Sequence, residues 1–147
     1  MLATRGMANI VSGQFKITPN KGSDRTKRKA EPHLTAGTFR RFISEVYADL
    51  PPGLPRALVA IMTVSDIHAF ADGNGRLGMV WLNRELEAIG QFPTLFTREL
   101  GIRGELNAAM HKARRNGGDV SFVVPVIRKA QQFARDFCKE LAQLHQH

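Results

Sequence analysis

Apolar residues recur at helical spacing along most of the chain, and the pattern predicts five helices. Their ranges are about 35–50, 55–67, 74–89, 102–115, and a last helix that begins near residue 119 or 121 and runs toward 144. In the first and last of these, apolar positions three or four residues apart form one face suited to burial. The sequence therefore predicts an all-α fold.

Proline and glycine mark where these helices end. The segment PPGLP, residues 51–55, ends the first helix because proline cannot continue one. Gly90 is expected just past the third helix, and Gly117 and Gly118 past the fourth. The inner face of the last helix is expected to carry Val126, Ile127, Phe133, Phe137, Leu141 and Leu144. No internal repeat or second domain is evident.

One short segment follows a different pattern. QFKIT, residues 14–18, alternates polar and apolar positions, which predicts a short strand. The stretch after it, PNKGSDRTKRKAEP, is rich in turn formers and charge, which predicts a loop.

Composition narrows the class of protein. The chain has 147 residues with 43% hydrophobic content, enough for one domain with a core. It has a single cysteine, Cys138, and so cannot form an internal disulfide, which fits a reducing cytosol. No apolar run approaches the roughly 18 residues of a membrane span, and the start lacks the apolar region of a secretory signal. We therefore expect a cytoplasmic location without a membrane partner.

The formal net charge of +8 is unevenly spread. Residues 1–33 carry seven lysines and arginines against two acids, and the densest run is SDRTKRKAE at 23–31. This run predicts either a solvated loop or a docking surface for an acidic partner. Aromatic residues do not interleave with these charges as a stacking platform requires, so we expect no nucleic-acid partner.

The nine residues HAFADGNGR, 68–76, hold the candidate chemistry between two predicted helices. A helix that begins at Gly73-Asn74-Gly75 presents unpaired amides and a positive dipole end, which suit a phosphate. Arg76 adds a cation, and Asp72 beside a phosphate suggests a bridging Mg²⁺. His68 can take a proton from a hydroxyl near neutral pH.

Each feature alone also has a structural explanation. A histidine at a helix end can be purely structural, and an aspartate in a loop often forms an Asx turn or caps a helix. Together, a base, a metal ligand and a phosphate cradle predict attack of a hydroxyl on a nucleotide phosphorus. Phe70 is expected to anchor the loop in the core.

HAFADGNGR resembles the signature of the Fic family, His-x-Phe-x-[Asp/Glu]-Gly-Asn-Gly-Arg-x-x-Arg. The fixed positions that match are His68, Phe70, Asp72, Gly73, Asn74, Gly75 and Arg76. The resemblance implies an all-α Fic-type helical bundle with a short β-hairpin flap, over residues 13–147. The stretch before Gly13, residues 1–12, is shorter than the family suggests, so an N-terminal helix is missing or belongs to another part of a longer protein.

The resemblance also implies an activity. Most Fic enzymes transfer AMP from ATP to a Ser, Thr or Tyr hydroxyl of a target protein. By resemblance, His68 is the general base, Asp72 the Mg²⁺ ligand and Gly73 to Gly75 the phosphate cradle. Within that cradle, Asn74 would hold the α-phosphate, and Arg76 would hold the β- and γ-phosphates.

The family's flap aligns a target segment by strand addition. Our flap candidate is about 14–34, with Gln14, Phe15, Lys16, Ile17 and Thr18 as the docking residues. The alternative for these five residues is an ordinary strand at the edge of the core.

One position departs from the signature. Its last arginine falls at residue 79, where this chain has Met79. In the family that arginine meets the terminal phosphate and pairs with an inhibitory glutamate, whose motif we do not find in the chain. A separate antitoxin or inhibitor protein is therefore a reasonable hypothesis, and the chain could be a toxin or a host-directed effector.

Met79 keeps two alternatives to AMP transfer open. One is a transferase that uses another donor or moves a phosphate, although phosphate-transferring relatives of the Doc branch carry lysine where this chain keeps Gly75. The other is a catalytically weak nucleotide-binding module. Retention of His68 argues against a pure binding module, which needs no base.

Overall fold

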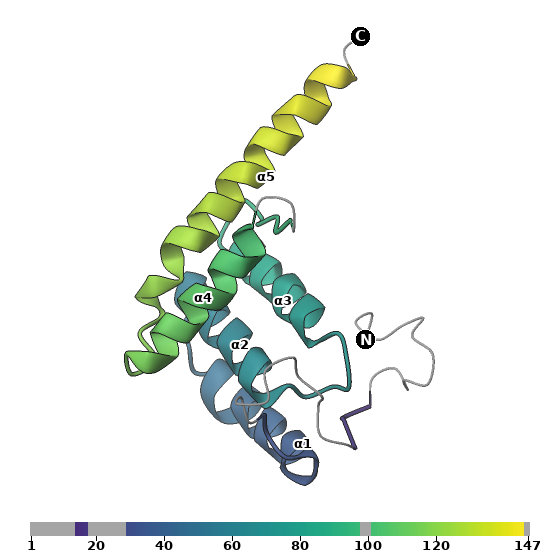
Figure 1. Ribbon diagram of the computed structural model, residues 1–147, viewed down its shortest axis with the longest axis vertical. Helices are drawn as coiled ribbons and strands as arrows, with labels where there is room; N and C mark the ends of the chain where they lie inside the picture. Colours follow the sequence, from purple (N-terminus) through teal and green to yellow (C-terminus); the bar gives the residue numbers. More distant parts are fainter. Residues whose placement is uncertain (1–13, 18–28, 98–100, 146–147) are drawn as a thin grey trace. The chain divides into compact units, whose positions relative to one another are not determined.

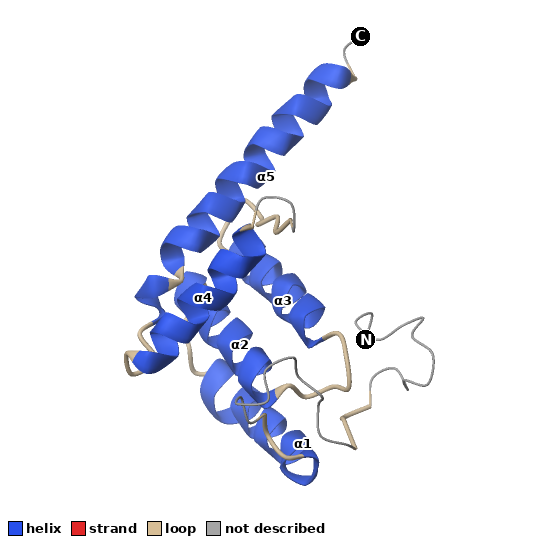
Figure 2. Cartoon of the chain, in the orientation of Figure 1, coloured by secondary structure: helices blue, strands red, loops and turns tan. Residues whose placement is uncertain are grey.

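The computed structural model describes residues 14–17, 29–97 and 101–145, which form helices joined by loops (Figures 1 and 2). The elements are α1 (Pro32–Arg41), the π-helix η1 (Phe42–Tyr47), α2 (Leu54–Ile67), α3 (Asn74–Ala88), α4 (Ile102–Arg115), the 3₁₀-helix η2 (Val120–Phe122) and α5 (Val124–Leu144). All five predicted helices are present. No described helix combines the length and apolar character needed to cross a membrane.

The described residues fall into two compact units. The first comprises residues up to Pro51 together with Val59–Trp81, and the second comprises Pro52–Leu58 together with the residues from Leu82 onward. Helices α2 and α3 each contribute residues to both units. The loop 68–73 and the first turns of α3 belong to the first unit.

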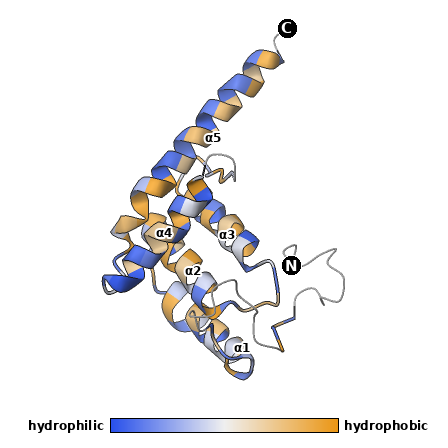
Figure 3. Cartoon of the chain, viewed as in Figure 1, coloured by the Kyte–Doolittle hydropathy of each residue, from blue (hydrophilic) through white to orange (hydrophobic). Residues whose placement is uncertain are grey.

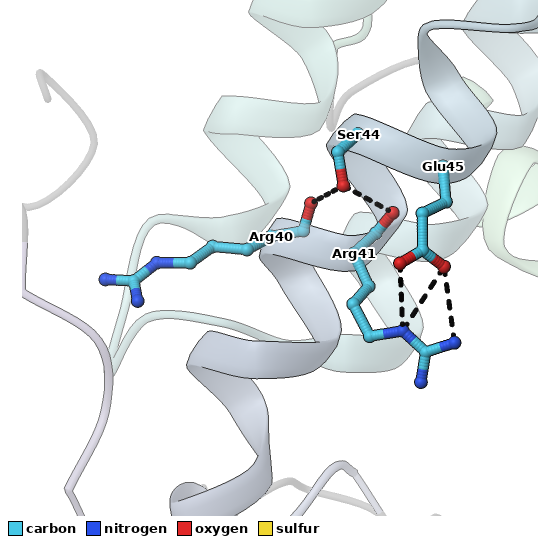
Figure 4. Close-up of polar contacts among 4 residues, drawn as sticks. All are labelled: Arg40, Arg41, Ser44 and Glu45. Atoms are coloured by element: carbon cyan, nitrogen blue, oxygen red, sulfur yellow. Dashed lines mark hydrogen bonds and ion pairs between the residues drawn. The ribbon is translucent and has the colours of Figure 1, made fainter.

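The first helix differs from its prediction at both ends. It begins at Pro32 rather than Thr35, because proline is tolerated in the first turn of a helix. Beyond Arg41 it continues as η1, where the Ala48 N–H donates to Ile43 O at 3.2 Å, five residues back. The Ser44 hydroxyl donates to Arg40 O at 3.1 Å, a contact of a kind that often bends helices (Figure 4).

Aromatic side chains form much of the core of the first unit. Phe42 is buried with Ala60, Ile67 and Ala69, and partly buried aromatic residues pack around them. Trp81 lies at the centre of the aromatic contacts, with ring centroids 4.8 Å from Tyr47, 6.0 Å from Phe42 and 6.3 Å from Phe39. These contacts connect the end of α1, η1 and α3 within the unit.

Hydrogen bonds and a buried ion pair connect the elements of the second unit. Glu85 of α3 pairs with Arg56 of α2 at 2.7 Å, and the Glu85 side chain is only 4% exposed. The Asn83 amide donates to Thr94 O and accepts from the Thr94 N–H, which holds the connector after α3. Gln131 of α5 donates to Phe92 O at 2.7 Å.

Helix ends follow the glycine pattern predicted from the sequence. Gly90, with φ of 69°, ends α3: its N–H donates to Glu87 O, and the Gln91 N–H donates to Leu86 O. Gly117 follows α4 in the same left-handed conformation. These two predictions are confirmed.

The apolar face predicted along α5 is buried only in the N-terminal part of the helix. The buried residues of α5 are Ile127, Ala130, Gln131 and Ala134. Phe137, Leu141 and Leu144 are exposed, so the prediction that they line an inner face is wrong in this chain. Figure 3 shows apolar positions recurring to the end of the helix, so the apolar stripe extends beyond the part that is buried.

Candidate active site

His68 directly follows α2 and has a left-handed backbone, with φ of 52°. Its N–H donates to Val64 O at 3.0 Å, so the left-handed turn comes directly after a helical hydrogen bond. Residues other than glycine rarely adopt this conformation, and such positions cluster at functional sites.

The His68 ring is held by a backbone carbonyl. Its Nδ1 lies 3.3 Å from Ser65 O. A carbonyl oxygen can only accept, so Nδ1 carries the hydrogen, and in the neutral ring Nε2 is then the proton acceptor. This is the tautomer that a general base needs if it is to take a proton at Nε2.

The surroundings of His68 favour the neutral ring. Burial lowers the pKa of His68 below its ordinary value, and the charges of Lys29 and Lys16 lower it further. The hydrogen bond to Ser65 and the Asp72 carboxylate act in the opposite direction. Because burial is the largest contribution, the imidazole is kept as a free base near neutral pH.

Asn74 closes the loop between the two helices. Its Nδ2 donates to Phe70 O at 2.7 Å and its Oδ1 accepts from the Phe70 N–H at 2.9 Å. The residue is only 3% exposed. Both polar atoms of this buried amide are therefore engaged in fixing the shape of the loop.

Phe70 anchors the same loop in the aromatic core, as the sequence predicts. Its ring stacks on Phe15 at 5.6 Å and meets Phe39 edge-on at 6.2 Å. The loop is thus held at its backbone by Asn74 and at its side chain by the core.

The start of α3 presents a backbone suited to an anion. Gly73 has φ of 81°, and the Leu77 N–H donates to Gly73 O at 2.9 Å. The amide of Gly75 precedes this bond and has no partner within the helix. Arg76, in the same turn, is half-exposed and lies 3.8 Å from the Asp72 carboxylate.

Asp72 fits the role of a magnesium ligand in part. One carboxylate oxygen accepts from the Gly73 N–H at 2.5 Å, and the side chain is half-exposed. Mg²⁺ in phosphate sites typically uses one or two protein carboxylates together with phosphate oxygens and waters. The described part of the chain has no group of three or more His, Cys, Asp or Glu side chains placed to hold a metal.

The strand predicted at QFKIT is not seen in residues 14–17, and Thr18 lies outside the described residues. Alternation places the apolar side chains on one buried face, yet Ile17 is 89% exposed and Lys16 only 3%. Lys16 is buried because it finds carbonyl partners: its N–H donates to Ala69 O at 3.0 Å and its ammonium to Ile67 O at 3.3 Å. Gln14 is exposed.

The rest of the flap candidate is also revised. Residues 29–31 form a loop, and Pro32 to Leu34 belong to α1. Residues 18–28, and the lead-in predicted for 1–12, lie outside the described residues.

Comparison with known proteins identifies the type of fold. No protein-family model and no curated protein matches the chain. Among solved structures, Fic-1 from C. elegans (residues 134–508) matches with a TM-score of 0.62 and 21% identity, over 89% of this chain and 38% of that one. A Fic domain-containing signaling protein from Bacteroides thetaiotaomicron matches with a TM-score of 0.54 and 19% identity, over 86% of this chain and 52% of that one.

The chain has a Fic-type fold. This confirms the predicted all-α class, with the flap hairpin not seen in residues 14–17 and 29–34. The chain spans about two fifths to one half of the length of these two Fic structures.

Within this Fic-type fold, the loop 68–73 and the start of α3 bring the motif residues into one segment of the first unit. Met79, at the position of the motif's last arginine, is partly buried on α3. Trp81 and Asn83, which follow it, take part in packing and in holding Thr94, respectively.

Three groups lie around His68 that the sequence does not place there: Lys16, which was predicted as a flap residue, Lys29 and the Ser65 carbonyl. The Lys29 ammonium donates to Ser65 O at 2.7 Å, the same oxygen that the His68 ring contacts. Lys29 stands in a charged run that predicts a solvated loop, so no local sequence pattern distinguishes it from the other lysines and arginines of that run.

Proposed function

We propose that the chain is a protein adenylyltransferase, which transfers AMP from ATP to a Ser, Thr or Tyr hydroxyl of a target protein. The observation that supports this most is the state of His68. Its Nδ1–H is committed to Ser65 O, which leaves Nε2 as a base, on the loop that leads into an anion-suited helix start.

The reaction proposed for these residues is a single displacement. The target hydroxyl oxygen forms a bond to the α-phosphorus of ATP while the bond from that phosphorus to the bridging oxygen breaks. The hydroxyl proton passes to Nε2 of His68, and pyrophosphate leaves with the bond electrons. The product is a phosphodiester between the target residue and AMP.

The phosphates would be held by the start of α3. We assign the backbone of Gly73, Asn74 and Gly75 to the α-phosphate region, where the helix dipole favours negative charge. The Arg76 guanidinium would bind the β- and γ-phosphates. The Asn74 side chain is engaged with Phe70, so its share in binding would be to hold the cradle in shape, and a direct contact with the α-phosphate remains a prediction.

Asp72 would hold the magnesium ion of an ATP–Mg²⁺ complex. When bound, the ion would neutralise charge on the phosphate oxygens and help orient them. Asp72 and Arg76 already approach each other, so a carboxylate for the ion and a cation for the phosphates lie side by side at the loop.

The target protein would be aligned near residues 14–18. Ile17 offers an exposed apolar side chain there, two residues from Phe15, which stacks on the loop residue Phe70. Backbone pairing by a target segment in this region would read shape more than sequence. The reaction would take place in the cytoplasm, of the producing cell or of a host, with a separate inhibitor protein as the proposed control.

Met79 supports a second candidate, transfer from another donor or transfer of the terminal phosphate. Without the arginine, the terminal phosphate loses a charged contact that contributes about 1–3 kcal/mol. Gly75 favours the nucleotidyl reaction over phosphate transfer.

Labelled ATP distinguishes these reactions. The chain is incubated with cell lysate, Mg²⁺ and ATP labelled separately at the α- or the γ-phosphate. Transfer of the α-label alone to protein is the expected result. Transfer of the γ-label means phosphate transfer, and binding of ATP without any labelling contradicts the proposed activity for the targets present.

A further inference from the structure

Two lysines from the N-terminal part of the chain hold the carbonyl groups around His68. Lys29 donates to Ser65 O at 2.7 Å, and Lys16 donates from its side chain to Ile67 O and from its backbone to Ala69 O. Ile67 and Ala69 are the residues on either side of His68. Lys16 therefore binds the carbonyls of the two residues that flank His68, and Lys29 binds the carbonyl that the His68 ring contacts.

We propose that Lys29 and Lys16 are positioning residues for His68, which fix the carbonyls at the end of α2 and so hold the imidazole with Nε2 as its proton-accepting atom. The proposal rests on the role of His68 as general base in the proposed function. Neither lysine is assigned a contact with substrate.

The carbonyl of Ser65 is the point where this positioning acts. It receives both the Lys29 ammonium and the His68 Nδ1. A carbonyl oxygen has two lone pairs and can accept from both donors. The charge-assisted hydrogen bond from Lys29 fixes the orientation of the Ser65 carbonyl. The ring then has a fixed acceptor for Nδ1, which sets the tautomer.

The charges of the two lysines also oppose an effect of the helix. The C-terminal end of α2 carries partial negative charge, which stabilises a protonated histidine placed there. The Lys29 ammonium on Ser65 O and the Lys16 ammonium on Ile67 O offset that charge. In agreement, Lys29 and Lys16 each lower the pKa of His68, while the Ser65 hydrogen bond and Asp72 raise it.

Burial makes Lys16 part of the fold rather than a surface charge. It is 3% exposed, and its neighbour Phe15 stacks on Phe70 of the active-site loop. Glu31 is the acidic group whose charge acts on Lys16. Movement of Phe15 and Lys16 would therefore change the positions of the Ile67 and Ala69 carbonyls on either side of His68.

The test is an NMR titration of the His68 ring in the full chain, with the signal assigned by its loss in His68→Asn. Lys29→Met removes both the charge and the donor, whereas Lys29→Gln removes the charge and leaves a neutral donor on a side chain one bond shorter, which no longer reaches Ser65 O as the Lys29 ammonium does. In both we expect the pKa of His68 to rise, and in Lys29→Arg to stay near the wild-type value. Arg41→Met is the matched control, since it removes an exposed cation of the same unit that pairs with Glu45 (Figure 4).

Enzyme kinetics provide the second readout. We expect the acidic limb of the pH profile for AMP transfer to move to higher pH in Lys29→Gln, with kcat lowered at acidic pH and KM for ATP unchanged. An unchanged His68 titration in Lys29→Gln overturns the proposal, even if Lys29→Met fails to fold. If the titration shifts as expected but no variant, wild type included, transfers AMP, the proposed function is wrong and the positioning stands.

Discussion

The side chain of Asn74 and the backbone of Phe70 form a closed pair of hydrogen bonds, at 2.7 and 2.9 Å, across the loop that follows His68. This pair joins the first residue of α3 to the middle of the loop. The backbone of the loop is therefore held by one buried amide, and the distance from His68 to the start of α3 depends on it.

Replacing Asn74 by alanine tests this dependence. The change removes the amide that bonds to the Phe70 N–H and C=O at a partly buried site, which should lower the free energy of unfolding by about 1–3 kcal/mol. Nucleotide affinity should fall as well, because the start of α3 loses its fixed position. Urea unfolding and calorimetry with ATP measure the two effects.

Asn116 offers a matched control for that variant. Its amide also donates to a backbone carbonyl, that of Lys112, but it is exposed. Asn116→Ala should change stability by much less and leave ATP binding unaltered. Equal losses in the two variants would show that the Asn74 bonds have no special role.

The ion pair of Arg56 and Glu85 predicts a large effect on stability. Glu85 is buried, so Glu85→Ala leaves the Arg56 cation without this carboxylate in a poorly solvated site, at a cost of about 3–5 kcal/mol. Glu105→Ala breaks the exposed pair with Lys129 and should cost about 0–1 kcal/mol. Chemical denaturation of both variants checks the difference, and similar costs would contradict the account of Glu85.

The lowered pKa of His68 predicts how stability depends on pH. In the folded chain the neutral ring is favoured, so the unfolded chain binds more protons as the pH falls below the ordinary histidine pKa of about 6.5. The stability contributed by neutral His68 is then present above that pH and is lost as the pH falls toward the folded-state pKa.

Unfolding measured from about pH 5 to 8 tests this sign. His68→Asn is the suitable comparison, because asparagine tolerates the left-handed backbone at this position. The wild type should lose more stability on acidification than the variant. An equal or smaller loss would mean that His68 is not held neutral.

Met79→Arg restores the last arginine of the Fic signature. If that residue meets the terminal phosphate, affinity for ATP should rise by roughly tenfold while affinity for AMP stays the same. Val80→Arg is the control, since Val80 is the neighbouring position on α3 and is 66% exposed. Calorimetry with ATP and AMP measures both, and a gain for AMP, or an equal gain in the control, contradicts the assigned contact.

Much of the fold could be predicted from local sequence, because its signals are local. Gly90 and Gly117 end helices through their own conformational freedom, and the apolar spacing of α2 to α4 gives their extents. The face of α5 was predicted correctly only where other parts of its unit cover it. A periodic pattern shows which side of a helix is apolar, but not how far along the helix other residues pack against that side.

In the site, too, the sequence predicts contacts between neighbouring residues but not contacts between distant ones. The motif residues of 68–76 lie together because they are adjacent in sequence. The burial of Lys16 and the sharing of Ser65 O by Lys29 and His68 depend on contacts across 36 residues or more. A lysine in a charged or alternating segment predicts solvent exposure, and only the three-dimensional structure shows the carbonyls that bind it.

The most direct test of the central claim is transfer of label from α-labelled ATP to protein by the wild type, His68→Asn and His33→Ala. His33 is an exposed histidine on α1 of the same unit and serves as the control. The account predicts labelling by the wild type and by His33→Ala, and none by His68→Asn with its fold intact. Labelling that persists in His68→Asn would contradict the assignment of His68 as the base.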